Sequence, residues 1–108
     1  MTFNDLLEAG YKQFPAPRHL TFCIRAAQKI VRAQVGSKLY FINVYESSWP
    51  DKHISMYAEV VFYDGLGGPS EAFRVERSVA ELAVTQMETF FADVYEALDC
   101  TPDVLNND

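Results

Sequence analysis

The clearest pattern in the chain lies in residues 78–99, where apolar side chains recur every three or four positions. Over about six helical turns this spacing places them on one face of an α-helix and leaves a polar face opposite. Ser78 is suited to cap the helix, and Glu81 follows at the spacing of a capping box. The sequence therefore predicts a long amphipathic C-terminal helix, whose apolar stripe consists of Val79, Leu82, Ala83, Met87, Phe90, Phe91, Val94 and Leu98.

Two further helices are predicted in the N-terminal part of the chain. The first runs from Thr2, which is suited to cap it, to Lys12. The segment 15–17 contains two prolines and interrupts the helical pattern, because proline lacks the backbone N–H and restricts its predecessor. The second helix then runs from Arg18 to Val35, and Gly36 ends it.

From Lys38 onward the period of the pattern changes to two, and β-branched and aromatic residues become frequent. These features predict three strands at residues 38–46, 54–63 and 71–77. The connections are too short for a crossover helix, so the strands should form an antiparallel meander. The expected fold class is α+β, with two N-terminal helices, the three-stranded meander, and the long C-terminal helix packed on the sheet.

Length and composition predict one domain. A chain of 108 residues with 49 % apolar content can form a single core, which we assign to residues 1–100, followed by a flexible tail at 101–108. The chain contains no apolar run of the roughly 20 residues that a membrane helix needs. The N-terminus lacks a secretory pattern, and two cysteines do not make a disulfide scaffold, so we expect a cytoplasmic protein.

Charge is unevenly distributed along the sequence. The net charge of −6 disfavours general binding to nucleic acids or anionic membranes. Residues 1–38 hold six basic and two acidic side chains, whereas residues 39–108 hold three basic and thirteen acidic ones. The two parts should attract each other, within one chain or across a dimer. Because they are self-complementary and the aromatic residues are numerous for one small chain, we expect a homodimer.

No motif in the sequence indicates catalysis. The glycine-rich segment 64–68 follows a strand but lacks the lysine and the following helix of a phosphate-binding loop. His19 and His53 have no second ligand at zinc spacing, and Cys23 lies on the predicted core face of a helix, where thiols are inert. We therefore expect a protein that is not an enzyme and has no catalytic residue, metal or cofactor.

Two surfaces are candidates for contact with a partner. The polar face of the last helix carries four carboxylates, of which the three glutamates are spaced about 11 Å apart, an array suited to a basic surface on another protein. Its members are Glu81, Glu88, Glu96 and Asp99. The other surface is aromatic and combines Trp49, in a loop, with Tyr57 and Tyr63 on the second face of the middle strand. Either one of the first two helices covers that face, or it is an interface.

These observations predict a small acidic protein-binding module, such as an adaptor, a chaperone-like factor or an inhibitor. It would act through the acidic helix face, the aromatic sheet surface, or both. Two alternatives remain open. One is an acidic mimic of nucleic acid that occupies a DNA- or RNA-binding protein. The other, which the net charge disfavours, is a nucleic-acid binder in which Arg25, Lys29 and Arg32 follow the phosphates along the second helix.

Overall fold

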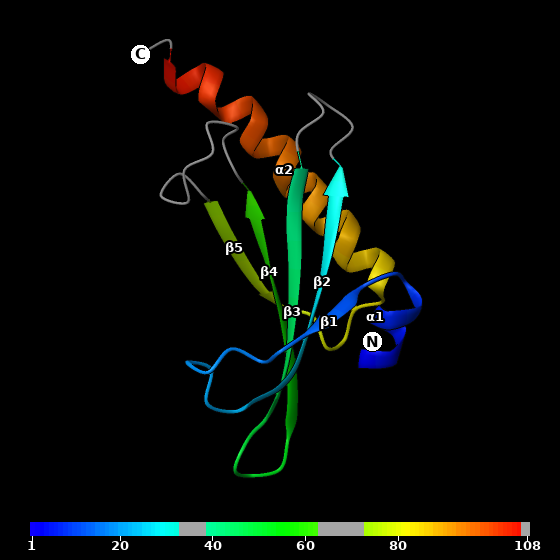
Figure 1. Cartoon of the computed structure of the whole chain (residues 1–108). Coiled ribbons are helices and arrows are strands. Elements are labelled where there is room, and N and C mark those ends of the chain that lie inside the picture. The colour runs from blue at the N-terminus through cyan, green and yellow to red at the C-terminus, as the bar shows by residue number, and fades with distance from the viewer. Residues whose placement is uncertain (33–38, 63–72, 107–108) are drawn as a thin grey trace.

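The structure, a computed structural model, describes residues 1–32, 39–62 and 73–106, with side chains for residues 1–32, 40–61 and 75–97. Five strands form one sheet in the order β1-β2-β3-β4-β5, and all neighbours are antiparallel. Figure 1 shows that α2 crosses one face of the sheet diagonally and that the β3–β4 hairpin extends beyond both helices. The elements are α1 (Phe3–Glu8), β1 (Lys12–Phe14), β2 (Cys23–Arg32), β3 (Leu39–Ser48), β4 (Ile54–Phe62), β5 (Phe73–Ser78) and α2 (Val84–Asn106).

The predicted meander corresponds to β3, β4 and β5, but the predicted fold class is wrong. The helix expected from Arg18 to Val35 is replaced by β2, and the first helix ends at Glu8, so that residues 12–14 form β1. The alternation of β2 explains the difference. Ala27 pairs with Val44 on the face covered by the helices, whereas Ala26 lies on the other face. Pairing with β3 therefore overrides the helix propensity of this segment.

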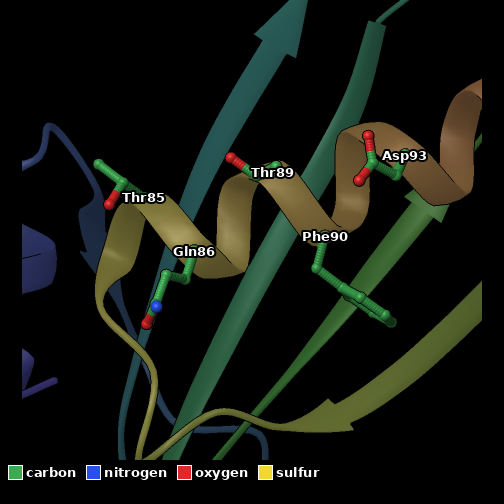
Figure 2. A pocket seen from close by; sticks show the side chains of 5 residues that line it. All are labelled: Thr85, Gln86, Thr89, Phe90 and Asp93. Carbon is green, nitrogen blue, oxygen red and sulfur yellow. The ribbon is translucent and has the colours of Figure 1, made fainter.

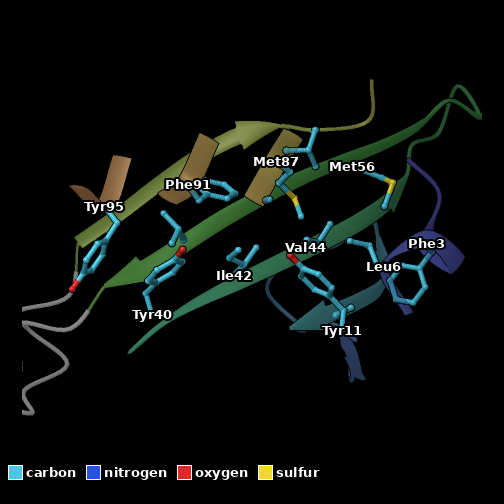
Figure 3. Close-up of a cluster of buried hydrophobic side chains, with 14 residues drawn as sticks. Phe3, Leu6, Tyr11, Tyr40, Ile42, Val44, Met56, Met87, Phe91 and Tyr95 are labelled. Atoms are coloured by element: carbon cyan, nitrogen blue, oxygen red, sulfur yellow. The ribbon is translucent and has the colours of Figure 1, made fainter. Parts of the chain in front are cut away.

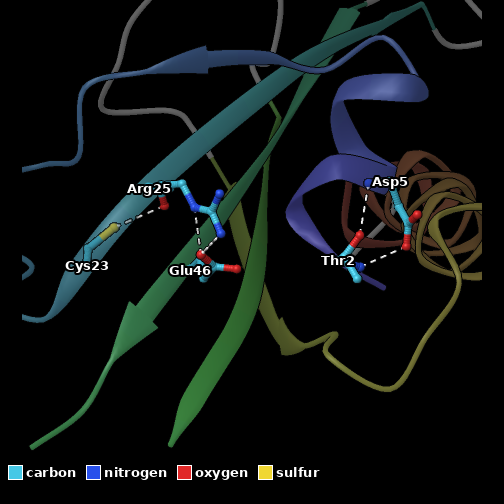
Figure 4. A network of polar contacts seen from close by, with 5 residues as sticks. All are labelled: Thr2, Asp5, Cys23, Arg25 and Glu46. Carbon is cyan, nitrogen blue, oxygen red and sulfur yellow. Dashed lines mark hydrogen bonds and ion pairs between the residues drawn. The ribbon is translucent and has the colours of Figure 1, made fainter. Parts of the chain in front are cut away.

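The cap of α1 follows the sequence prediction. The Asp5 backbone N–H donates to Thr2 Oγ1 at 3.2 Å, and the Thr2 N–H donates to the Asp5 carboxylate at 2.8 Å (Figure 4). This capping box satisfies two donors that the first turn leaves free. The helix is short because the chain turns at Gly10, whose φ of 94° favours glycine.

The predicted cap of the C-terminal helix is wrong. Ser78 is the last residue of β5, where it pairs with Tyr57, and α2 begins only at Val84. Strand pairing thus takes the residue that would otherwise cap a helix. The side-chain oxygen of Gln86 instead accepts a hydrogen bond from the Ala83 N–H at 2.9 Å, which satisfies one donor of the first turn.

The turn before α2 is held by the other end of the chain. The N-terminal amino group of Met1 donates to the carbonyl oxygens of Ala80 at 2.8 Å and Leu82 at 2.9 Å. From there α2 continues to Asn106, so it includes most of the segment 101–108 that the sequence analysis assigned to a tail. Within the described residues, no helix is long and apolar enough to cross a membrane.

The core lies between the helices and one face of the sheet (Figure 3). The predicted alternation of β4 is confirmed at its centre, where Met56, Ala58 and Val60 are buried on this face. Both helices contribute to the same cluster, which also contains Phe3, Leu6, Tyr11, Ala27, Tyr40, Ile42, Val44, Val79, Met87, Phe91 and Tyr95. Both described helices therefore pack on the same face of the sheet.

Two ion pairs connect the basic first part of the sequence with the acidic remainder. Arg25 contacts Glu46 with its Nη2 at 2.5 Å, and Lys29 Nζ contacts Glu88 at 2.9 Å (Figure 4 shows the first pair). The attraction expected between the two parts is thus present within one chain. Because both pairs retain some exposure, their contribution to stability is small at moderate salt.

We predict that Phe91→Ala lowers the free energy of unfolding by about 3–5 kcal/mol, because this ring is fully buried. Phe90 should matter less, since it is only partly buried and its ring lies against the Arg77 guanidinium, 4.4 Å from its centroid. Urea unfolding of the two variants measures the difference. Equal losses would show that α2 packs on the sheet in another rotation.

Candidate functional site

The β3–β4 hairpin ends in a three-residue loop, Pro50 to Lys52. The Lys52 N–H donates to the carbonyl oxygen of Trp49 at 2.8 Å, and the Trp49 N–H donates to that of His53 at 3.0 Å. Lys52 has a φ of 71°, as expected for the last residue of such a loop. The Asp51 carboxylate accepts the His53 N–H at 3.2 Å and contacts its imidazole. These hydrogen bonds hold the pKa of Asp51 below its usual value.

Trp49 is fixed in place by three neighbours. Its indole N–H donates to Ser55 Oγ at 2.7 Å. The His53 ring stacks on it, with centroids 5.9 Å apart and planes 13° apart, and the Phe22 ring lies at 5.0 Å. The indole is nevertheless 38 % exposed. Trp49 is thus an oriented aromatic side chain at the surface.

Other apolar side chains are exposed at this end of the sheet, on both of its faces. Phe22 is 39 % exposed, and its carbonyl oxygen accepts the Ser48 N–H at 2.9 Å, which ties the chain before β2 to the end of β3. Ile54, opposite Ser48, is 52 % exposed, and Ile24, near the start of β2, is 50 % exposed. We call Phe22, Ile24, Trp49 and Ile54 the apolar tip. In Figure 1 this end of the hairpin lies beyond α1 and α2.

An aromatic row continues from the tip along the face of the sheet that is opposite α2. The Tyr57 and Tyr45 rings are 5.4 Å apart, and Phe14 meets Tyr45 edge-on at 6.2 Å. The small side chain of Ala26 lies between Phe14 and Tyr45 in register, which lets their rings meet. No helix in the described part of the chain covers this face, because both pack on the other one. Tyr63, the third predicted aromatic residue, lies outside the described residues.

A polar row crosses the same face of all five strands. The Gln28 amide donates to Asn43 Oδ1 at 2.8 Å, and the Asn43 amide donates to Glu59 Oε1 at 3.3 Å. The Tyr45 hydroxyl donates to the same oxygen at 2.8 Å, so the buried Glu59 carboxylate has hydrogen-bond partners. In register, the row consists of Lys12, Gln28, Asn43, Glu59 and Glu76. The sequence analysis missed it because β1 and β2 were not predicted.

The predicted acidic array on the last helix is not formed. Glu81 lies in the turn before α2, and Glu88 contacts Lys29 rather than solvent alone. Glu96 is exposed, and the side chain of Asp99 lies outside the described part. Among the three described glutamates, Glu81 is therefore outside the helix on which the line was expected.

The predicted basic array is also absent. Arg25 and Lys29 lie on the face of β2 that the helices cover, and each contacts a carboxylate. Arg32 lies on the opposite face, because residues seven apart in a strand alternate sides. The spacing that would align the three side chains on a helix separates them in a strand.

A hollow of about 390 Å³ lies along α2 on its exposed side (Figure 2). Thr85, Thr89 and Asp93 follow one line of the helix, and Gln86 and Phe90 follow the next. Asp93 is the only ionisable lining residue, so the hollow offers no pair of groups for acid–base chemistry. Elsewhere in the described part, no three His, Cys, Asp or Glu side chains are grouped to hold a metal.

No protein-family model, curated protein or solved structure matches this chain. The fold and its surfaces define a two-layer α+β domain with one helix-covered face and an apolar tip. The tip is therefore the candidate functional site.

We predict that Cys23 reacts slowly with thiol reagents. It is half-buried near the start of β2 rather than in a core, and burial together with the nearby Glu46 raises the pKa of its thiol. A raised pKa lowers the thiolate fraction at pH 8, so the rate in a Cys100→Ser background should fall below that of free cysteine and rise at higher pH. Ellman's reagent measures this rate. A rate at or above that of free cysteine at pH 8 would contradict the prediction.

Proposed function

We propose that this protein is a non-enzymatic protein-binding module that contacts its partner through the apolar tip. The supporting observation is where the exposed large apolar side chains lie. Among the residues whose side chains the structure describes there are six, and four of them form the tip. Exposed apolar residues that occur singly are ordinary, whereas four at one projecting end of a sheet, two of them (Phe22 and Trp49) in ring contact, are characteristic of an interface.

The geometry of Trp49 supports this proposal. Tryptophan is frequent among the residues that dominate binding energy, since it supplies a large apolar area. The hydrogen bond to Ser55 and the contacts with His53 and Phe22 hold the indole in one orientation before binding. Less side-chain entropy is then lost in the complex. The expected partner is a protein with an apolar pocket that accepts the indole.

The aromatic row can enlarge the contact area beyond the tip. A stable interface buries about 800 Å² on each partner, which is more than four side chains at a hairpin end provide. Tyr57 lies two residues from Ser55 on the same strand face, and Tyr45 adjoins it. A partner seated on Trp49 would therefore extend along these tyrosines.

The other functions expected from the sequence have less support from the geometry. A partner with a basic surface was inferred from the acidic helix face, but Glu88 contacts Lys29 within the chain. The nucleic-acid mimic depends on the same array. The nucleic-acid binder needs Arg25 and Arg32 on one side, and β2 places them on opposite faces.

We predict that Trp49→Ala and Ile54→Ser each weaken partner binding at least about tenfold, because they remove exposed apolar contacts and no core side chain. A protein captured from the source cells with the wild-type chain would be purified and titrated against each variant. Acrylamide quenching of Trp49, the only tryptophan in this chain, should decrease in the complex once the partner's own tryptophans are subtracted with a Trp49→Phe variant.

The matched control is Leu7→Ser, which removes a side chain of similar exposure on α1, away from the tip. It should bind like the wild type. The triple change of Glu81, Glu88 and Glu96 to lysine tests the acidic face in the same titration. If that variant loses the partner while the tip variants keep it, the proposal for the tip is wrong.

The homodimer and the cytoplasmic location remain predictions. Light scattering should give twice the single-chain mass of 12.3 kDa at tens of micromolar if two copies associate. Should the tip also join the two copies, Trp49→Ala will reduce the mass to that of one chain. A single-chain mass for the wild type would contradict the dimer and leave the proposal for another partner in place.

A further inference from the structure

The outer edge of β2 is only partly paired. β1 pairs with Ala26 to Gln28, and its first residue, Lys12, is opposite Gln28. Beyond this point the chain leaves the edge at Gly10, while β2 continues to Arg32 with β3 on its inner side. In the described part of the chain, residues 29–32 therefore have a strand neighbour on one side alone. Backbone N–H and C=O groups at such an edge can pair with another strand.

A hollow of about 380 Å³ lies along β1 and extends past its first residue, Lys12, to the open edge of β2. Ile30, on this edge, is 57 % exposed, the largest fraction among the exposed large apolar side chains of the described part. An apolar side chain from an added strand would find both space and an apolar contact here. The lining residues are Gly10, Lys12, Gln13, Phe14, Gln28, Lys29 and Ile30.

The charge at this edge is positive in an otherwise acidic chain. Lys12 and Arg32 are exposed, whereas Lys29 is paired with Glu88 at 2.9 Å. By register and alternation, Lys12, Ile30 and Arg32 lie on the same face, opposite α2. The positions of Gln28 and Arg32 are about 13 Å apart along the strand, so the two cations flank Ile30.

We propose that the open edge of β2 binds an extended acidic peptide segment of another protein as an added strand. Opposite Arg32 the segment carries an acidic residue, and opposite Ile30 an apolar one. Because Lys12 already occupies the place opposite Gln28, the segment leaves the edge there, and a second carboxylate two residues after the apolar one contacts the Lys12 ammonium beside the strand. These positions define the pattern acidic, any, apolar, any, acidic. Main-chain hydrogen bonds supply affinity in such complexes, and alternate side chains supply specificity.

This site is separate from the apolar tip. Ile24 of the tip and Ile30 are six residues apart on β2, or about 20 Å along the strand. A second copy of this chain fits the edge less well than an acidic segment does. If β2 paired with β2 of another copy, the positive charges of Lys29 and Arg32 on one copy would lie near those of the other copy. Such like charges across a strand pair are destabilising.

The test uses end-blocked, fluorescein-labelled peptides of the sequence Glu-Thr-Val-Thr-Glu, extended by one threonine at each end. The first control replaces both glutamates with lysine. The second keeps the glutamates but methylates alternate backbone nitrogens, which removes strand hydrogen bonds and leaves the charges. Fluorescence anisotropy at low salt should show binding of the first peptide only, and this binding should weaken as salt is added.

Variants of the full chain test the residues. Lys12→Glu and Arg32→Glu should each weaken binding of the acidic peptide about tenfold. Lys52→Glu, which makes the same charge change in the hairpin loop, should not change binding, and neither should Trp49→Ala. Amide shifts in NMR spectra should change for residues 28–32 on addition of the peptide.

Three results would overturn the proposal. Equal affinity for the lysine peptide would remove the acidic preference, and equal affinity for the methylated peptide would show charge attraction without strand addition. Binding that increases on dilution, in step with loss of a two-chain mass, would show that a second copy occupies the edge. Because Trp49→Ala affects only the tip, failure here leaves the proposed function of the tip untouched.

Discussion

The pairing of β2 with β3 is the interaction on which the rest of the structure depends. It runs from Cys23 to Arg32 and joins the basic first part of the chain to the sheet. Through it, Ala27 reaches the core under α2, and Arg25 and Lys29 reach their carboxylates. It also supplies the edge on which β1 pairs. Without this ladder the other three strands would lack the side of the sheet that α1 covers.

The parts of the fold that the sequence predicts are those decided by local contacts. The capping box of α1, formed by Thr2 and Asp5, belongs to this group, and so do the strands with alternating β-branched residues. Both are present. β2 could not be predicted in the same way. Its alanine, glutamine, lysine and arginine residues favour a helix in isolation. The contact that decides otherwise is the pairing with β3, whose partner residues lie 7 to 24 positions further along the chain. Ser78 is likewise suited to cap a helix in isolation, but in the structure it pairs with Tyr57 as the last residue of β5.

The candidate site could be predicted only in part, for the same reason. The sequence indicates Trp49, because it is an aromatic residue in a short polar loop. Its neighbours Phe22 and Ile24 precede it by more than twenty residues, and they reach the tip only because β2 is a strand. The same change removes the acidic array, since the charge that neutralises Glu88 comes from Lys29 on β2.

When the helices of a fold pack on one face of its sheet, the other face is open to non-specific association with other molecules. Here the polar row divides that face, and the burial of the Glu59 carboxylate is offset by hydrogen bonds from Tyr45 and Asn43. A second sheet stacked on this face would cut the row off from water without giving its charged ends new partners, which is costly. The two ends of β2 differ from the middle of this face, because exposed apolar side chains and, in the described part, an edge with a strand on one side alone are found there. Strand β2 thus carries core contacts that fix the fold, and the two sites proposed for another molecule lie at its opposite ends.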